Sequence, residues 1–353
     1  MKLFLVIFSM AIALITSEFL VRGYEYFFTD KHLIVSKTEI IRSALNIPYE
    51  REAVLGFLFP LGSKITDRIL NEHRITTEAF YAIDPWGLRL DDTYGEQFFA
   101  DKYTAFFGCS FTFGQLVNSD KSLPAQFQRL RSRTHVYNYS VIGGGPHETL
   151  YRLRNFETPL KEKSGTAIFV WIDPHLERIA GSASYFSWHP SHRTPLYEMD
   201  GNTLVLRGFF DDMLKKRPIL ALNLFMGRLS RRSRLMAKII PRLPERLWYS
   251  SELWTLAAEQ LSAIKTVAEN RLGAARFIVI VWPNSTLGSK TLIPLLNKKG
   301  IESLDYSNLW DYPVPEHLKI PFDGHPSAEA YKIVAEHLSL DLRNQSRKNA
   351  STL

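Results

Sequence analysis

Residues 106–114 read FFGCSFTFG, an apolar stretch that ends on small and polar residues between two glycines. The longer segment YTAFFGC, over 103–109, has the composition of a buried strand. Gly108 and Gly114 permit a tight turn directly after that strand, and Ser110 lies in the turn. Ligands of open parallel sheets bind beyond the carboxyl ends of the strands. Ser110 is therefore a candidate nucleophile, which needs a base and oxyanion donors from other loops.

Outward from this stretch, the pattern alternates between strands and helices. Further strands are expected over 135–141, 165–173, 276–283 and 301–306, and helices over 122–132, 146–163, 251–272, near 289–299 and over 326–342. This alternation predicts a parallel sheet that is covered by helices on both faces. With 353 residues, 45% of them hydrophobic, the chain is long enough for a large core. The last helix presents one apolar face, made by Tyr331, Val334, Ala335, Leu338 and Leu342.

Two later segments can complete the chemistry of Ser110. In PFDGHPSAEAY, over 321–331, His325 directly precedes the last helix and Asp323 lies two residues upstream. Such an acid–histidine pair can orient the imidazole and stabilise its charged form. In VIGGGP, over 141–146, three glycines at the end of the second strand can direct N–H groups into the same pocket.

Together these segments resemble the SGNH (GDSL-type) hydrolase superfamily. FFGCSFTFG resembles its Gly-Asp-Ser-Phe-Thr-x-Gly block, VYNYSVIGGGPHETL its Asn-x-Gly-x-x-Gly-x-Gly block, and DGHPSAEAY its last Asp–His block. IDPWGLR, over 83–89, resembles an Asn-x-x-Gly-x-Arg segment of extracytoplasmic members. The resemblance implies that Ser110 is the nucleophile, His325 the general base and Asp323 its orienting acid. It also implies that Gly143 donates its N–H to the oxyanion beside the N–H of Ser110.

We therefore expect an α/β fold, a three-layer α/β/α sandwich with a parallel, flavodoxin-like sheet. The expected hydrolase-like domain covers 101–345, with an insertion over 181–250. An N-terminal extension over 26–100 precedes this domain, and a tail over 346–353 follows it.

The chain departs from the family pattern at three places. Cys109 replaces the usual Asp before the serine, and Phe322 stands where relatives carry the acid three residues before the histidine. The third block lacks its oxyanion Asn and reads VWIDPHLERI, over 170–179. Two interpretations of His175 stay open. Either it replaces the Asn as an oxyanion donor, or with Arg178 it forms a structural cap or an ion pair with Asp173 or Glu177.

The start of the chain has the composition of a segment that enters a membrane. After Lys2, residues 3–17 carry no charge, and the apolar run reaches about 20 residues only if Glu18 lies at the interface. Residues 1–25 are expected to be a signal-anchor or a cleaved signal peptide, with residues 3–21 in the membrane. The catalytic domain would then be extracytoplasmic, in the periplasm.

A second charged feature lies within the insertion. Residues 207–246 hold eleven Lys or Arg and three Asp or Glu, against a net charge of +7 for the whole chain. Either this segment is a solvated insertion, or it is a basic amphipathic lid that contacts anionic surfaces. Nucleic acid is not an expected partner.

The resemblance implies a membrane-anchored serine esterase or O-acyltransferase that acts on acyl esters, of cell-surface polysaccharide or of lipid. The alternative is a catalytically weak SGNH scaffold that binds carbohydrate or partners at the membrane. The single cysteine excludes an internal disulfide, and the histidines show no shared ligand spacing. We expect no metal and no cofactor.

Overall fold

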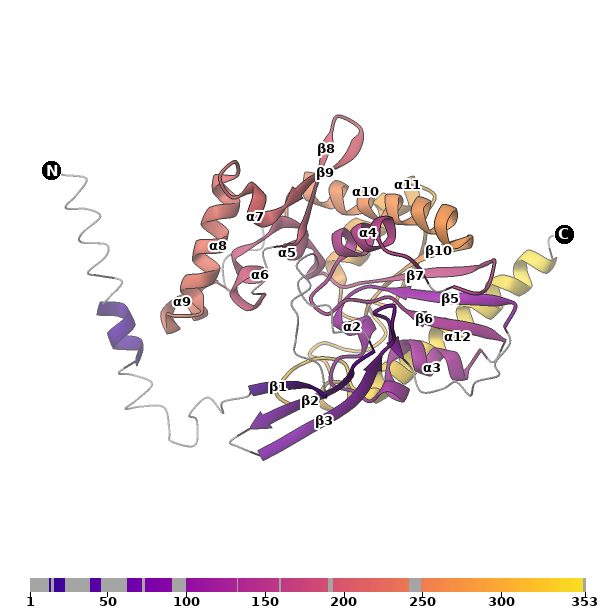
Figure 1. Ribbon diagram of the computed structural model, residues 1–353, viewed down its shortest axis with the longest axis horizontal. Coiled ribbons are helices and arrows are strands. Elements are labelled where there is room, and N and C mark those ends of the chain that lie inside the picture. Colours follow the sequence, from indigo (N-terminus) through magenta and orange to yellow (C-terminus); the bar gives the residue numbers. More distant parts are fainter. Residues whose placement is uncertain are drawn as a thin grey trace.

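The protein is described from a computed structural model that covers residues 13, 16–22, 39–45, 62–71, 74–90, 100–131, 133–158, 160–189, 193–240 and 249–351. Its centre is a nine-stranded sheet with the order β1-β2-β3-β4-β6-β5-β7-β10-β11 (Figure 1). The strands of this sheet are β1 (Glu39–Leu45), β2 (Lys64–Asn71), β3 (Arg74–Ile83), β4 (Arg89–Leu90), β5 (Lys102–Phe107), β6 (Thr134–Asn138), β7 (Gly165–Trp171), β10 (Ala274–Val281) and β11 (Glu302–Asp305).

The parallel half of the sheet has the predicted flavodoxin-like topology. Strands β6, β5, β7, β10 and β11 lie side by side and pair in parallel. Numbered along the chain, their order is 2-1-3-4-5, which is the flavodoxin-like order. The expected α/β sandwich is therefore confirmed, and the carboxyl ends of β5, β6 and β7 lie at one edge of the sheet.

Helices cover both faces of this sheet (Figure 1). One face packs against α4 (Pro146–Asn155), α10 (Ser251–Val267) and α11 (Ile293–Lys298), and the other against α3 (Leu123–Arg129) and α12 (Ala328–Ser351). Side chains alternate between the faces, as the geometry of a strand requires. In β5, for example, Phe107 packs in the first core and Phe106 in the second.

The predicted apolar face of the last helix is confirmed. Its five residues are buried in the core against the sheet. Helix α12 continues to Ser351, across the expected boundary at 345. Helix α4, in contrast, stops earlier than the predicted 146–163, because Phe156 adopts an extended backbone after Asn155.

The N-terminal extension contributes strands to the same sheet. Strands β1, β2 and β3 form an antiparallel meander, and β4 joins it to the parallel half by pairing Arg89 with Asn138. The sequence predicts only a mixed segment here. The consequence is that Arg89 is placed beside the turn that carries Ser110.

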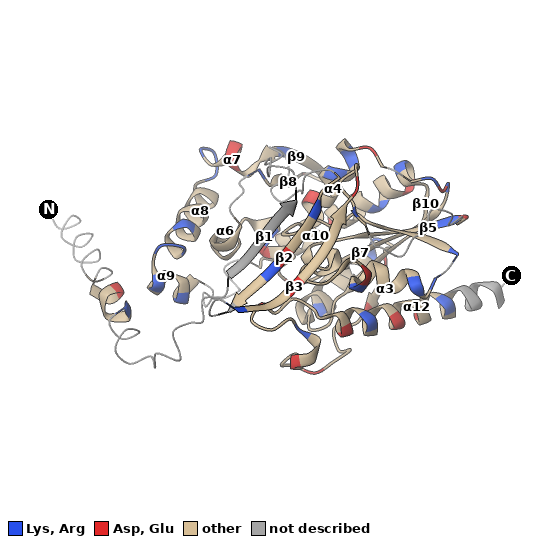
Figure 2. Cartoon of the chain, turned by 60° about the horizontal axis from the view of Figure 1, so that its bottom comes forward, with Lys and Arg blue, Asp and Glu red and all other residues tan. Residues whose placement is uncertain are grey.

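The insertion forms a small unit of its own at one end of the molecule. It contains the hairpin β8 (Pro195–Asp200) and β9 (Thr203–Phe209), and the helices α6 (Ala183–Trp188), α7 (Phe210–Met213), α8 (Pro218–Ser230) and α9 (Arg234–Ile239). Its apolar cluster is made by Tyr185, Phe186, Phe210, Leu220 and Leu224. Arg228 in α8, Arg231 and Arg232 between the helices, and Arg234 and Lys238 in α9 are five of the eleven Lys and Arg residues of the basic segment (Figure 2).

The remaining short elements are α2 (Ser110–Phe113), α5 (His175–Ala180), the 3-10 turns at Ser119–Lys121 and Glu316–Leu318, and π-helical turns at Ala268–Leu272 and Gly288–Leu292. Most of the predicted signal-anchor over 1–25 lies outside the described residues. Among the helices that the structure describes, none has the length and apolar character needed to span a membrane.

Candidate active site

Ser110 begins the short helix α2, directly after β5. The two flanking glycines are required by the backbone and by the space around them. A Cβ on Gly108 would lie 2.3 Å from Thr112 Oγ1, and Gly114 has a φ of +83° with Ser122 Cβ 2.7 Å from where its own Cβ would be. The turn therefore accepts glycine at both positions and presents Ser110 at the edge of the sheet.

The structure brings Ser110, His325 and Asp323 together. Ser110 Oγ lies 2.9 Å from His325 Nε2, and His325 Nδ1 is hydrogen-bonded to Asp323 Oδ1. The same Asp323 oxygen accepts the backbone N–H of His325 at 3.1 Å. The three side chains therefore have the mutual geometry of a nucleophile, a base and an orienting acid.

A tight turn makes the two-residue spacing between Asp323 and His325 workable. The N–H of Ile320 donates to the carbonyl of His325 at 2.7 Å, and Gly324 adopts a φ of +88° inside the turn. Phe322, at the position where relatives carry the acid, is exposed. The imidazole is held from its other side by Phe111, whose ring centroid lies 5.3 Å away.

Two backbone N–H groups are free to meet an oxyanion. Val141 N–H donates to the Gly108 carbonyl at 3.1 Å, which ties the glycine loop after β6 to the turn before Ser110. Gly143 has a φ of +74° in this loop. Neither the N–H of Ser110 nor that of Gly143 has an acceptor among the described residues.

Buried charged groups hold the glycine loop from behind. Arg178 donates from Nη1 to the Gly144 carbonyl, and Glu148 accepts the N–H of Gly145 at 2.8 Å. Glu148 also pairs with His147, whose Nε2 lies 2.8 Å from its carboxylate. Burial alone would raise the pKa of Glu148, but the charge and hydrogen bonding of His147 bring that pKa below its usual value. The sequence marks Arg178 as a candidate structural residue, but it does not predict the hydrogen bond of Arg178 to the Gly144 carbonyl. No motif in the sequence indicates the role of Glu148.

His175 is not brought to Ser110. Its side chain is fully buried between Phe169 and Trp171, with ring centroids 5.6 Å and 5.2 Å away. Its Nδ1 accepts the N–H of Ile172 at 3.3 Å, and no contact with Ser110 or His325 is seen among the described residues. Burial, with help from the charges of Arg178 and His147, lowers the pKa of His175 well below its ordinary value. A neutral ring packed in the core fits a structural role.

This burial gives a prediction for pH-dependent stability. Because the folded state keeps His175 neutral, the unfolded state binds one more proton below a pH of about 6.5. The free energy of unfolding should fall by up to about 1.4 kcal/mol per pH unit as the pH decreases below that value. His175→Gln should flatten this slope in urea unfolding series between pH 7 and pH 5. The same change at exposed His337 is the control, and an unaltered slope in His175→Gln would contradict the assignment.

Two other residues of the blocks that resemble the family have structural contacts. Cys109 is completely buried in the core beside α12, so its thiol does not face the site. Asn138 donates from Nδ2 to the Phe113 carbonyl at 3.3 Å and accepts the Ser140 hydroxyl at 2.7 Å.

Arg89, from the IDPWGLR segment, holds the other side of the nucleophile turn. It is buried, and its guanidinium donates to the carbonyls of Phe113, Gly114 and Val117. The guanidinium carbon lies 4.5 Å from the centroid of the Tyr81 ring in β3. The antiparallel extension thus reaches the candidate site through Arg89, and also through the Tyr81 ring, whose centroid lies 5.3 Å from that of Phe113 in α2.

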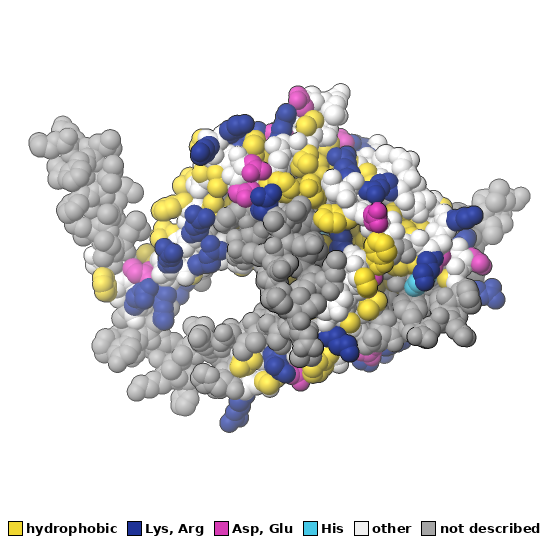
Figure 3. All heavy atoms as spheres, in the orientation of Figure 1, with side chains coloured by type: hydrophobic (Ala, Val, Ile, Leu, Met, Phe, Trp, Pro, Cys, Tyr) yellow, Lys and Arg dark blue, Asp and Glu magenta, His cyan; other side chains and the backbone are white. Residues whose placement is uncertain are grey.

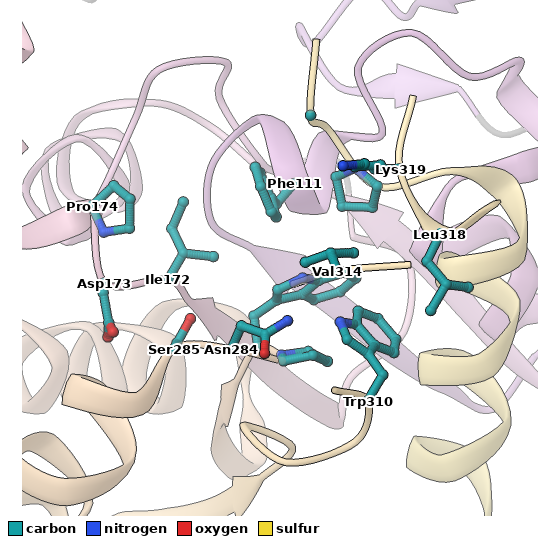
Figure 4. A pocket seen from close by; sticks show the side chains of 14 residues that line it. Phe111, Ile172, Asp173, Pro174, Asn284, Ser285, Trp310, Val314, Leu318 and Lys319 are labelled. Carbon is teal, nitrogen blue, oxygen red and sulfur yellow. The ribbon is translucent and has the colours of Figure 1, made fainter. Parts of the chain in front are cut away.

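A pocket opens beside His325 (Figure 4). Its cavity volume is about 220 Å³, and its wall is mostly apolar. Phe111, which follows Ser110, lines it, as do Gly324 and Pro326 on either side of His325. Trp282 and Trp310 form its aromatic part, with ring centroids 6.1 Å apart.

Comparison with known proteins finds matches among solved structures. No family model matches the chain, and no curated protein matches it. A member of the lipolytic protein G-D-S-L family from Veillonella parvula DSM 2008 is 11% identical, over 67% of this chain and 94% of its own, with a TM-score of 0.35. A catalytic mutant of Axe2, an acetylxylan esterase from Geobacillus stearothermophilus, is 9% identical over 67% and 92%, with a TM-score of 0.36.

The acetyl xylan esterase Est2A from the rumen bacterium Butyrivibrio proteoclasticus is 9% identical, over 86% of this chain and 99% of its own, with a TM-score of 0.42. With its 2-1-3-4-5 parallel sheet and its meeting of Ser110, Asp323 and His325, the chain resembles the SGNH hydrolase superfamily that its sequence motifs indicate.

Proposed function

We propose that the protein is a serine ester hydrolase or O-acyltransferase that forms an acyl-enzyme on Ser110. The observation that carries this proposal is the 2.9 Å approach of Ser110 Oγ to His325 Nε2, with Asp323 hydrogen-bonded to the opposite ring nitrogen. A serine hydroxyl is a weak nucleophile alone, and this arrangement supplies the base that activates it.

In the first half of the proposed reaction, Ser110 Oγ attacks the ester carbonyl carbon while its proton moves to His325 Nε2. Asp323 stabilises the imidazolium that forms. The N–H groups of Ser110 and Gly143 stabilise the oxyanion of the tetrahedral intermediate. When the intermediate collapses, His325 gives its proton to the departing alkoxide, and the acyl group remains on Ser110.

In the second half, a hydroxyl group attacks the acyl-enzyme by the same steps in reverse. Water yields a free acid, which is ester hydrolysis, and a sugar or lipid hydroxyl yields a new ester, which is acyl transfer. The free N–H groups of Ser110 and Gly143 support activity, although the Asn of the third family block is absent. Loss of one such donor typically costs about 10²–10³ in rate.

The test is a panel of p-nitrophenyl esters from acetate to palmitate. We expect hydrolysis of at least the short esters, whose small acyl groups need no pocket of their own. Asp323→Asn should lower kcat by about 10²–10⁴, because the imidazole loses its orienting partner. The matched change at exposed Asp311 should have no effect. A well-folded protein that cleaves no ester in the panel would refute the proposal.

We also propose that residues 3–21 hold the chain at a membrane, with the catalytic domain on the extracytoplasmic side. The support is the uncharged run over 3–17 and the contacts of Glu18, which follows it. The Glu18 carboxylate accepts the Ser233 hydroxyl at 2.7 Å and the N–H groups of Arg234 and Leu235, both at 3.1 Å. The segment that follows the apolar run is thereby joined to the start of α9.

The surface next to this junction has the composition of a membrane-contacting element. On α8, Ile219, Leu222 and Phe225 are each more than half exposed. Basic side chains gather over α8 and α9 beside them (Figure 3). An apolar stripe flanked by Lys and Arg is typical of helices that lie in the interface of anionic lipid.

The chain's single cysteine allows a direct test of this surface. Cys109 is buried, so Phe225→Cys can be labelled alone with an environment-sensitive fluorophore in the full chain. We expect its emission to shift to the blue in vesicles with anionic lipid, and less so in neutral vesicles. A label at Leu340→Cys, exposed on α12, is the control. Its emission should be that of a fluorophore in water with both kinds of vesicle. Equal emission from the two sites would contradict the proposal.

A further inference from the structure

The pocket beside His325 lies on a particular side of the site. Gly324 and Pro326, the neighbours of His325, line it, whereas the glycine loop over 143–145 is absent from its lining. In the proposed reaction the glycine loop holds the carbonyl oxygen, and His325 gives a proton to the departing alkoxide. The group bonded to that alkoxide oxygen must therefore lie on the histidine side. The pocket is placed to hold the alcohol half of the ester.

Two hydrogen-bond donors in this pocket lack acceptors. Asn284 Nδ2 and Trp310 Nε1 are buried from solvent and have no hydrogen-bond partner among the described residues. The carboxylate of Asp173, also in the lining, already accepts the N–H groups of Leu287 at 3.0 Å and Gly288 at 2.7 Å. A buried donor left unpaired is unfavourable, so a ligand that brings acceptors is favoured here.

The walls set the size and shape of that ligand. The cavity of about 220 Å³ is smaller than the roughly 300–1,000 Å³ of sites that enclose a whole drug-sized molecule. It has room for one ring and not for a long chain. Around Asn284 and Trp310 the lining is mostly apolar and includes Phe111, Trp282 and Val314. Figure 4 shows Phe111, Val314, Asn284 and Trp310 around one hollow.

We propose that this pocket is a sugar subsite, in which one pyranose ring forms the alcohol half of the ester, with its oxygens accepting hydrogen bonds from Asn284 and Trp310. The C–H faces of such a ring suit aromatic walls, and its oxygens satisfy both donors. A lipid alcohol would satisfy neither. This inference rests on the proposed function, and it applies equally to an acceptor sugar, which enters where the first alcohol left.

The test compares two acetate esters of matched ring size. Methyl 6-O-acetyl-glucopyranoside offers hydroxyl and ring oxygens, whereas cyclohexylmethyl acetate carries the same primary acetate ester on a ring without them. We expect kcat/KM to be at least about 10-fold higher for the sugar ester, because the site hydrogen-bonds its substrate.

Two variants assign the preference to the named donors. Asn284→Asp keeps the side-chain shape and tolerates the φ of +65° at this position, but it replaces the donor by an acceptor. Trp310→Phe keeps an aromatic wall and removes the N–H. Each should lower the ratio of the two kcat/KM values about 5- to 10-fold, the effect of one hydrogen bond. Asn308→Asp, at an exposed position outside the pocket, should leave the ratio unchanged.

The outcomes separate this inference from the proposed function. If the protein hydrolyses neither of these esters and no p-nitrophenyl ester, the ester chemistry itself is refuted. Hydrolysis of both with equal kcat/KM, or a preference for cyclohexylmethyl acetate, would refute the sugar subsite while the ester chemistry stands. A sugar preference that survives both Asn284→Asp and Trp310→Phe would also overturn the assignment of this pocket.

Discussion

Ser110→Ala is expected to abolish ester cleavage and covalent labelling by a fluorophosphonate. The alanine removes the only hydroxyl that lies 2.9 Å from His325 Nε2 among the described residues, so no acyl-enzyme can form. In serine hydrolases such a change lowers kcat by about 10⁴–10⁶, and the remainder comes from binding and the oxyanion donors. The measurements are initial rates on short p-nitrophenyl esters and in-gel fluorescence after labelling.

Three further variants make this result specific. Ser251→Ala, at an exposed serine on α10, should retain full labelling. Cys109→Ala should also retain it, since the thiol is buried in the core. His325→Gln should lose about as much activity as Ser110→Ala, and the double variant should be no worse, because the two residues act as a unit. Labelling that persists in Ser110→Ala would show that another nucleophile reacts.

The parts of the site that the sequence predicts are those fixed by position along the chain. Ser110 and Gly143 follow consecutive strands, and His325 precedes the last helix, so a parallel sheet brings their loops to one edge. The strand order 2-1-3-4-5 confirms this arrangement, and Ser110 does contact His325. Asp323 also reaches the site, because Gly324 has a positive φ and the resulting turn brings the Asp323 carboxylate back to His325.

The parts that the sequence does not predict depend on packing between distant segments. His175 stands near the expected place of the missing Asn, yet its ring turns into the core against Trp171. Glu148 and Arg178 hold the glycine loop through backbone atoms, and no spacing of side chains encodes such contacts. Asn284 lies after β10, a strand not adjacent to β5, and only the pocket shows that its amide is unpaired. Sequence motifs therefore locate the reacting groups, whereas the groups that support them or determine specificity can be identified only in the folded structure.

Arg89→Met is expected to have the largest effect on stability of any single change near the site. Methionine keeps much of the apolar stem but leaves the carbonyls of Phe113, Gly114 and Val117 without their guanidinium donor. Hydrogen bonds to a buried charged group contribute about 1.5–3 kcal/mol each, and they are not fully additive. We expect the free energy of unfolding to fall by about 3–5 kcal/mol.

The effect should also reach catalysis, because these carbonyls belong to the turn that starts at Ser110. Urea unfolding gives the stability, and the ester rate of the fraction that remains folded gives the activity. Arg129→Met, at an exposed arginine that pairs with Asp120, is the matched control and should change stability by less than about 1 kcal/mol. Arg89→Lys should rescue only part, since a lysine cannot reproduce the planar fork that reaches three carbonyls. If Arg89→Met were as stable and active as Arg129→Met, Arg89 would have no part in holding the nucleophile turn.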